Sequence, residues 1–478
     1  MKRFGTRIGD VRQRVEIKRT TQYAAPEAPS ARRPLPAALV FVLGFGALIA
    51  IGTVLLSLPL SAANGQGTPL IDALFTATSA VCVTGLVVVD THSHWSGFGQ
   101  AVILGLIQAG GFGFMTSSTL LLMVVVRGRT RLRDRVLVQE SLGGGRAGAG
   151  ELGDIRALIK RIAIFTIAIE LAGAGILAAS YASRSDQTVH PLWFGLFHSV
   201  SAFNNAGFDV LGGFRSLTGF SGDYLLLGTH GALIIIGGLG FAIVADVWRN
   251  RSWVRLALET KVVVATTVVL IIGGAVLIGA FEWNNAATFG SMPESERALN
   301  AVFKSVTART AGFNSIDNAA LLAPAALIVM ALMFIGGASG STAGGIKVNT
   351  FSVLLIAIIS TALGKPSAEA FGRRIPHAVI YRALAVALLG VAFLFATILG
   401  LELLSDIPML DVMFEAVSAF ATVGLSRNVT PDLPDPALIV LIIAMFVGRL
   451  GPLTVVLALT ARSRPVPYRH AVESMRIG

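Results

Sequence analysis

The chain has 478 residues, of which 54% are hydrophobic and 14% are charged, and its formal net charge is +11. Soluble proteins carry about 25% charged residues, so this composition excludes a water-soluble enzyme and indicates an integral membrane protein. The single cysteine, Cys82, excludes an internal disulfide framework and a thiolate metal site.

Most of the 38 lysine and arginine residues lie in stretches that flank long apolar segments. These stretches are 1–33, 127–161, 249–261, 365–382 and 462–476. An excess of Lys and Arg marks the cytoplasmic side of a membrane protein, so we expect all five stretches, and with them both termini, in the cytoplasm. Two cytoplasmic termini require an even number of membrane spans.

Eight apolar runs are long enough to cross a bilayer, which takes about 20 helical residues. In chain order they lie near 36–58, 98–126, 162–182, 224–248, 261–281, 321–360, 377–404 and 437–461. The runs form four pairs, and a shorter semi-polar segment lies between the members of each pair. These segments, which suit re-entrant loops that return to the same side of the membrane, are 70–88, 190–211, 295–316 and 408–427.

The four short segments align with one another, which indicates an internal repeat. Each carries a Phe, then Ser or Thr followed by Ala, then a Gly followed by a bulky apolar residue. The Phe and Gly positions are Phe75 and Gly85, Phe197 and Gly207, Phe303 and Gly312, and Phe414 and Gly424. The sequence therefore predicts an all-α integral membrane protein with eight transmembrane helices in four helix–pore-loop–helix repeats around a central pore.

The repeats divide the chain into five parts. A basic cytoplasmic tail at 1–33 precedes repeat 1 at 34–127, repeat 2 at 128–249, repeat 3 at 250–364 and repeat 4 at 365–478. The last part ends in a short cytoplasmic tail.

An ion that crosses a bilayer must exchange its hydration shell for other ligands, and a ring of backbone carbonyls supplies them. Glycine permits the backbone angles that aim such carbonyls at a central axis. We therefore expect a cation-selectivity filter at the aligned glycines and the residues before them: Thr84, Gly85, Ala206, Gly207, Ala311, Gly312, Val423 and Gly424. Four hydroxyls are expected to face away from the ion and to cap or brace the short pore helices, namely those of Ser79, Ser201, Thr307 and Ser418. Acidic residues near the outer ends of the short helices are Asp72, Glu294 and Asp411.

The second span of each pair carries another repeated pattern of small residues. Its members are Gly110-Gly111-Phe112-Gly113, Gly237-Gly238-Leu239-Gly240, Gly336-Gly337-Ala338-Ser339-Gly340 and Gly448-Arg449-Leu450-Gly451. Small residues let membrane helices pack closely, and we interpret most of these glycines in this way.

A glycine-rich run at 336–347 interrupts the apolar stretch of repeat 3, which is too long for one straight span. A non-helical segment at this depth is tolerated only where it lines a cavity or is buried in protein. We expect an intramembrane gate formed by Gly336, Gly337, Ser339, Gly340, Ser341, Thr342, Gly344, Gly345, Lys347 and Arg449. An alternative reading of Lys347 is that it marks the cytoplasmic boundary.

Arg449 lies inside an apolar segment, at the position where the other repeats have Gly111, Gly238 and Gly337. A cation at this depth costs about 2.5–3.5 kcal/mol on insertion scales, so it should face the pore or a buried partner. We expect polar groups of the loop, such as those of Ser339, Ser341 and Thr342, to bind it and hold the gate closed. Arg309 should brace the third pore loop from behind, because a cation lining the filter would repel the ion.

On these motifs the sequence resembles the Trk/Ktr/HKT superfamily of potassium transporters, and most closely the Ktr-type membrane subunit. The resemblance covers roughly 36–461, and its most specific parts are 201–208, 307–313, 336–345 and Arg449. It implies a homodimer with a potassium ion in the pore at the filter residues. It also implies a gate loop at 336–347 beneath the filter, with Arg449 as the constriction arginine.

The resemblance implies potassium uptake across the cytoplasmic membrane of a bacterium, with no enzymatic activity, no covalently bound cofactor and no nucleic-acid partner. It further implies a separate cytoplasmic nucleotide-binding regulatory subunit, which we expect to dock on 127–161 and 249–261. Two alternatives stay open. The first is a secondary active cation symporter, which would have two large inverted repeats. The second is a sodium-selective member of the same superfamily, against which Gly85 argues because sodium-preferring plant members carry Ser at this position.

Overall fold

The computed structural model describes residues 37–125, 155–184 and 187–451. All of them belong to a unit that spans residues 36–478. The predictions for the tails at 1–33 and 462–476, and for most of the loop 127–161, fall outside the described residues.

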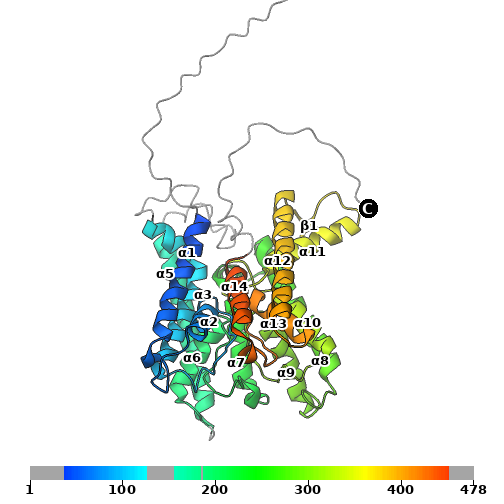
Figure 1. The fold of residues 1–478 in the computed structure, drawn as a ribbon. Coiled ribbons are helices and arrows are strands. Elements are labelled where there is room, and N and C mark those ends of the chain that lie inside the picture. The colour runs from blue at the N-terminus through cyan, green and yellow to red at the C-terminus, as the bar shows by residue number, and fades with distance from the viewer. Residues whose placement is uncertain (1–36, 126–154, 185–186, 452–478) are drawn as a thin grey trace, which may run out of the picture. The chain divides into compact units, whose positions relative to one another are not determined.

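Nearly all regular secondary structure in the described residues is helical, and in each repeat a helix of 12 to 14 residues follows a longer first helix (Figure 1). Repeat 1 has α1 (Ala37–Leu56), α2 (Leu70–Val81) and α3 (Gly97–Val125). Repeat 2 has α5 (Ile155–Ala182), α6 (Pro191–Phe203) and α7 (Tyr224–Asn250). Repeat 3 has α8 (Leu258–Glu282), α9 (Glu294–Thr307), α10 (Ala323–Phe334) and α11 (Val348–Ala362). Repeat 4 has α12 (His377–Leu404), α13 (Met409–Ala421) and α14 (Asp435–Leu450).

Two short strands form a hairpin between α11 and α12. Strand β1 (Glu369–Ala370) pairs antiparallel with β2 (Arg373–Arg374), with Glu369 opposite Arg374 and Ala370 opposite Arg373. The sequence pattern gave no sign of this hairpin, because two residues per strand are too few for a period to be visible.

Proline sets the start of all four short helices. Pro69, Pro293 and Pro408 directly precede α2, α9 and α13, and Pro191 is the first residue of α6. A helix leaves its first N–H groups without partners inside the helix, so the missing N–H of proline costs nothing there. The predicted acidic residues follow in the first turns, with Asp72 in α2, Glu294 in α9 and Asp411 in α13.

Five helices in the described part of the chain are long and apolar enough to cross a membrane. They comprise Leu39–Leu56, Ile159–Ala182, Tyr224–Asn250, Leu258–Glu282 and His377–Leu404. Their large apolar side chains are widely exposed, as Leu388 and Phe395 of α12 illustrate. Exposed leucine and phenylalanine along a long helix suit contact with lipid. The remaining apolar helices include α10 and α11, which are two halves of the broken stretch in repeat 3.

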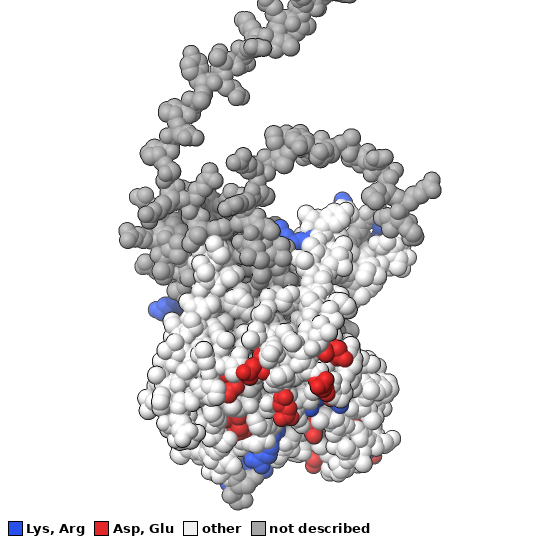
Figure 2. Space-filling view, in the orientation of Figure 1, with Lys and Arg blue, Asp and Glu red and all other residues white. Residues whose placement is uncertain are grey.

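The short helices form the buried centre of this unit. The Phe of each repeat motif is at most 3% exposed, at positions 75, 197, 303 and 414. Acidic side chains gather over the lower half of the face in Figure 2, the half in which α6 and α9 lie in Figure 1.

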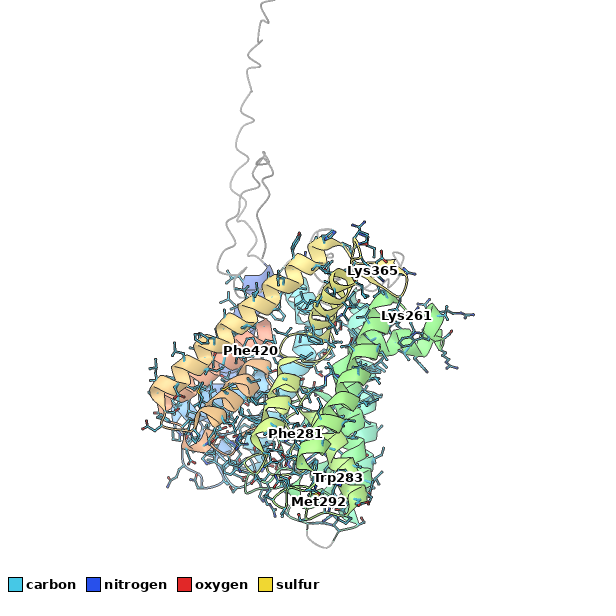
Figure 3. The ribbon with its side chains drawn as sticks, turned by 90° about the vertical axis from the view of Figure 1, so that its right-hand side faces the viewer. Lys261, Phe281, Trp283, Met292, Lys365 and Phe420 are labelled. Atoms are coloured by element: carbon cyan, nitrogen blue, oxygen red, sulfur yellow. The ribbon has the colours of Figure 1, made fainter. Side chains whose placement is uncertain are left out.

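The two ends of the helical unit differ in their side chains. Figure 3 shows Lys261, at the start of α8, and Lys365, after α11, at one end of the unit. Trp283 and Met292 lie at the opposite end, and Phe420 lies between. Two of the basic stretches therefore share one end, as the charge pattern predicts.

Candidate functional site

The loops after the four short helices share one backbone conformation. The aligned glycines have φ of +91° at Gly85, +71° at Gly207, +82° at Gly312 and +90° at Gly424. Two residues before each glycine the chain is also left-handed, with φ between +50° and +73° at Val83, Asn205, Thr310 and Thr422. A β-branched residue rarely adopts this region, so the repeated conformation is a strained feature held by its surroundings.

The four glycines lie against one another in a closed ring. A Cβ atom added at Gly85 would lie 3.1 Å from the Cα of Gly207, and one added at Gly207 would lie 3.0 Å from the Cα of Gly312. One added at Gly312 would lie 3.3 Å from Gly424 Cα, and one at Gly424 would lie 3.0 Å from Gly85 Cα. The order around the ring is therefore the order of the repeats in the chain.

The carbonyl before each glycine faces the glycine of the preceding repeat, and the carbonyl before Gly85 faces Gly424. A Cβ added at Gly85 would lie less than 3.0 Å from the carbonyl oxygen of Ala206, and one added at Gly207 would lie as close to that of Ala311. The same holds for Gly312 and the oxygen of Val423, and for Gly424 and the oxygen of Thr84. Real Cβ atoms essentially never come this close. The structure thus brings together all eight residues that the sequence indicated for the filter.

The predicted hydroxyls bond to the loops, in two different ways. In repeats 1 and 4 the hydroxyl accepts from the glycine N–H, at 3.0 Å for Ser79 and Gly85 and 3.1 Å for Ser418 and Gly424. In repeats 2 and 3 it donates to the carbonyl after the glycine, from Ser201 to Phe208 at 2.7 Å and from Thr307 to Phe313 at 2.8 Å. The hydroxyls thus join each short helix to the loop that follows it, as acceptors in repeats 1 and 4 and as donors in repeats 2 and 3.

A polar column of the repeat alignment, directly after the Phe, supplies a second set of braces that the sequence reasoning missed. Its members are Thr76, His198, Lys304 and Glu415, and all are at most 1% exposed. His198 Nε2 accepts from the N–H of Val210 at 3.4 Å, and Lys304 donates to the side-chain oxygen of Asn318. Glu415 accepts from the hydroxyl of Ser426 at 2.5 Å and from the N–H of Arg427 at 3.1 Å. Three of the four therefore tie a short helix to the chain that leaves the glycine ring, and a polar residue in all four repeats was the available signal.

Asn204, next to the second filter loop, belongs to another buried network. Its amide donates to Gln108 and to Glu170, both at 2.9 Å, and Gln108 donates to Glu170 at 3.2 Å. These contacts tie the end of α6 to α3 and α5.

The repeated glycines of the second spans make room for the short helices. A Cβ at Gly110 would meet the carbonyl of Val81, one at Gly237 that of Phe203, and one at Gly448 that of Phe420. The close-packing interpretation holds at these positions. It fails at Gly240, where φ of 76° and ψ of 161° break α7 against the loop residues Gly340 and Ser341.

The run 336–347 is not helical, as its glycine content predicts. Helix α10 ends at Phe334 and α11 begins at Val348. The ends of the run close on each other, because the N–H of Gly336 donates to the carbonyl of Ile346 at 2.9 Å and that of Val348 donates to Gly337 at 2.9 Å. The run therefore forms a loop with a narrow neck.

This loop lies directly against three of the filter loops. The hydroxyl of Thr342 donates to the carbonyl of Phe203 at 3.1 Å, and the N–H of Ala338 donates to Gly238 at 2.8 Å. A Cβ at Gly344 would contact the hydroxyl of Thr422, and one at Gly336 would lie 3.3 Å from the Cγ2 of Thr310. The loop therefore lies under the second, third and fourth filter loops.

Three cationic side chains bond to carbonyls of the loop, and one of them, Lys347, belongs to the loop itself. Arg449 is 1% exposed, and its guanidinium donates to the carbonyl of Thr342 and, at 3.2 Å, to that of Gly110. Arg309 donates to the carbonyl of Gly336 at 2.9 Å, so it braces the loop 336–347. Lys347 donates to the carbonyl of Ala343. Of the loop residues expected to bind Arg449, Thr342 does so through its backbone carbonyl, while its hydroxyl donates to the carbonyl of Phe203.

Comparison with known proteins identifies the family of this chain. A family model, TrkH, described as a cation transport protein, matches residues 44–464. The chain is 39% identical to Ktr system potassium uptake protein B of Bacillus subtilis (strain 168) over 419 residues, which cover 87% of this chain and 91% of that protein. It is 37% identical to the potassium/sodium uptake protein NtpJ of Enterococcus hirae over 453 residues, which cover 94% of this chain and 98% of that one.

A solved structure shares the fold. The crystal structure of the potassium transporter TrkH from Vibrio parahaemolyticus matches with a TM-score of 0.68 at 18% identity, over 91% of this chain and 87% of that one. The family is assigned on two findings. The family model matches most of the chain, and the relatives are similar along nearly their whole length. The chain belongs to the TrkH family of cation transport proteins.

Proposed function

We propose that this chain takes up potassium ions across the cytoplasmic membrane of a bacterium, through a single pathway lined by the four glycine loops. The observation that carries the proposal is the closed ring of Gly85, Gly207, Gly312 and Gly424, in which the carbonyl before each glycine lies against the glycine of a neighbouring repeat. Four carbonyl-bearing loops around one axis are the arrangement that replaces the hydration shell of an alkali cation.

The short helices favour a cation at the ring. Each ends directly before a filter loop, so the partial negative charge of four helix C-termini points toward the same place. Acidic residues sit in the first turns of three of them, at the opposite ends. These charges complement the helix dipoles and make the outer side of the pathway attractive to cations.

The gate in this proposal is the loop 336–347 together with Arg449. The loop lies against three of the four filter loops, and a buried guanidinium beside it repels a permeating cation. Opening requires the loop to move away from Arg449 and Phe203. The left-handed glycines Gly340 and Gly345 permit such a change of backbone.

Eight spans and two cytoplasmic termini complete the proposed topology. Five helices are long enough by themselves, α10 and α11 together make a sixth span broken by the gate loop, and α3 and α14 supply the others. The placement of Lys261 and Lys365 at one end supports a cytoplasmic face there (Figure 3). The four units follow one another in the same order of long and short helices, which favours this arrangement over the two inverted repeats of a symporter.

A homodimer with a separate cytoplasmic nucleotide-binding regulatory subunit is the proposed assembly. The cytoplasmic stretch 249–261 offers apolar side chains for such a partner, with Val254 82% and Trp253 47% exposed. Aromatic residues are enriched at the centres of protein interfaces. The stretch 127–161, the other expected docking loop, lies mostly outside the described residues.

Electrical recording tests the function. The purified protein in a planar bilayer, with a potassium gradient and an opposed sodium gradient across it, is expected to give currents that reverse near the potassium equilibrium potential. A reversal potential that follows the sodium or proton gradient would favour the symporter. Equal permeability to the two ions would favour a potassium/sodium pathway, which the name of the Enterococcus hirae relative suggests.

A further inference from the structure

We propose that Asn205, Thr310 and Thr422 form a second, side-chain cation site directly below the glycine ring, and that Thr342 of the gate loop takes one of its ligands when the gate is closed. The inference rests on the proposed function and adds to it a site whose ligands are side-chain oxygens.

The first support is position. These three residues stand two places before the filter glycines of repeats 2, 3 and 4, and repeat 1 has Val83 there. All four adopt left-handed backbone angles and are at most 1% exposed. Non-glycine residues in this region cost about 1–3 kcal/mol each and persist where the surroundings impose them, often at ligand sites.

The second support is the convergence of the side chains. The amide of Asn205 lies 3.4 Å from the hydroxyl of Thr310, although 105 residues separate them. The side-chain oxygen of Asn205 lies 3.3 Å from the hydroxyl of Thr342. The hydroxyl of Thr422 faces the backbone of Gly344 in the same loop. Side chains from three repeats thus lie along the filter side of the gate loop, where the methyl group of Thr310 faces Gly336 and its hydroxyl faces Asn205.

The third support is an unpartnered group. The hydroxyl of Thr422 is fully buried and makes no hydrogen bond in the described structure. A buried hydroxyl without a partner costs about 1–3 kcal/mol, so it calls for an explanation. Hard alkali cations take uncharged oxygen ligands, and a dehydrated cation leaving the ring toward the cytoplasm would supply the missing partner.

The contact of Thr342 gives the site a link to the gate. Its hydroxyl is shared between the carbonyl of Phe203 and the side-chain oxygen of Asn205. A cation that takes the Asn205 oxygen removes one contact that holds the loop. Cation binding and loop closure therefore oppose each other, and by linkage the effect is reciprocal.

Thallium ions, which scatter anomalously and resemble potassium in size, test the site in crystals of the full chain. We expect one peak in the glycine ring and a second beside the hydroxyl of Thr422. Thr422→Val, which is close to isosteric, should abolish the inner peak and leave the ring peak. A ring peak without an inner peak overturns this inference alone, whereas the absence of both overturns the proposed function.

Potassium titration calorimetry of the detergent-purified chain provides the solution test, and Val83 provides a matched control. Losing one oxygen ligand, in Thr310→Val or Thr422→Val, should weaken potassium binding about tenfold. Val83→Thr, which adds a hydroxyl at the same backbone angle, should strengthen it and should restore binding in the Thr422→Val background. Thr342→Val should also strengthen binding, because the competing hydroxyl is gone. Unchanged affinity in both single valine variants would overturn the site.

Discussion

The guanidinium of Arg449 donates a hydrogen bond to the backbone carbonyl of Thr342, and so ties the last described helix, α14, to the gate loop of repeat 3. A second N–H of the same guanidinium reaches the carbonyl of Gly110 in α3. One buried cation therefore joins three repeats at the depth where the loop lies against the filter.

Replacing Arg449 by Ala removes this tie and the positive charge beside the pathway. The loop loses a charge-assisted hydrogen bond, and such bonds contribute about 1.5–3 kcal/mol. We expect a higher ion flux in proteoliposomes with the potassium/sodium permeability ratio largely kept, because no filter residue is changed. Arg427→Ala is the matched control, since Arg427 pairs with Asp411 at 2.5 Å and does not contact the loop. A folded, membrane-inserted Arg449→Ala protein that conducts no faster than wild type would mean that the gate lies elsewhere.

Deleting residues 338–343 tests the loop itself. The deletion removes Thr342 and the backbone that contacts Gly237 and Gly238, so the barrier below the filter should shorten. We expect faster flux with selectivity kept, as for the arginine variant. Flux at or below the wild-type rate in a correctly inserted protein would show that the segment serves only to pack helices.

The two kinds of hydroxyl brace predict an unequal mutational series. Ser79→Ala and Ser418→Ala leave the buried N–H of Gly85 and Gly424 without an acceptor, at a cost of about 1–3 kcal/mol. Ser201→Ala leaves a carbonyl without a donor, which proteins tolerate more often. We expect the first two variants to lower the melting temperature and the potassium/sodium ratio more than Ser201→Ala. Equal effects at all three positions would mean that it does not matter whether the serine hydroxyl accepts or donates the hydrogen bond to the loop.

External pH should modulate uptake through Asp209, two residues after Gly207 and outside the five long spans. Burial, with a further contribution from Asp90, raises the pKa of this carboxyl to about 6, while the N–H groups of Leu211 and Gly212 and the charge of Arg215 oppose the shift. Lowering the pH from 7.5 to 5 therefore protonates Asp209 and removes a negative charge near the pathway. Uptake at low potassium concentration should fall about two- to fivefold as local cation attraction is lost.

The variant Asp209→Asn isolates that group. Its uptake should be low and flat across the same pH range. Folding stability should change with pH in the opposite direction to uptake. Because the pKa of Asp209 is raised in the folded state, the folded protein binds the proton at a higher pH than the unfolded chain does. The free energy of unfolding should therefore increase as the pH falls from 6 toward 4. A wild-type pH profile in Asp209→Asn would assign the dependence to another group.

Cysteine labelling tests the topology on a Cys82→Ala background. Lys365→Cys should react only with reagents that enter the cell, and Ser291→Cys should react with impermeant reagents added outside. The two positions lie near opposite ends of the helical unit, as the labelled Lys365 and Met292 show (Figure 3). Outside labelling of position 365 would invert or refute the proposed orientation.

Much of the helical architecture could be predicted from local sequence patterns. The apolar run at 36–58 became α1 from Ala37 to Leu56, and the glycine-rich run at 336–347 fills the gap between α10 and α11. These features depend on composition and length alone. The repeat alignment also indicated which residues meet at the ring, because four copies of one unit around an axis place equivalent positions together.

Tertiary contacts could not be predicted in the same way. The partners of Arg449 are 107 and 339 residues away in the chain, and nothing local distinguishes a carbonyl from a hydroxyl partner. The break of α7 at Gly240 depends on the gate loop that packs against it. The local Gly-Gly-x-Gly pattern contains no sign of that loop, and we therefore interpreted it as part of an unbroken helix. The polar column at His198, Lys304 and Glu415 was visible, but its role depends on where the outgoing loops return.

The potassium/sodium permeability ratio of glycine-ring variants tests the central claim most directly. Gly85→Ser and Gly312→Ser place a side chain where an added Cβ already meets the carbonyl of Ala206 or Val423, so the ring must open or distort. Gly65→Ser is the matched control, because Gly65 has φ of +69° but no atom within 4 Å of an added Cβ. Bi-ionic reversal potentials should show a clear loss of potassium preference in both ring variants and none in the control. Ratios equal to wild type in Gly85→Ser and Gly312→Ser would contradict a selectivity filter at this ring.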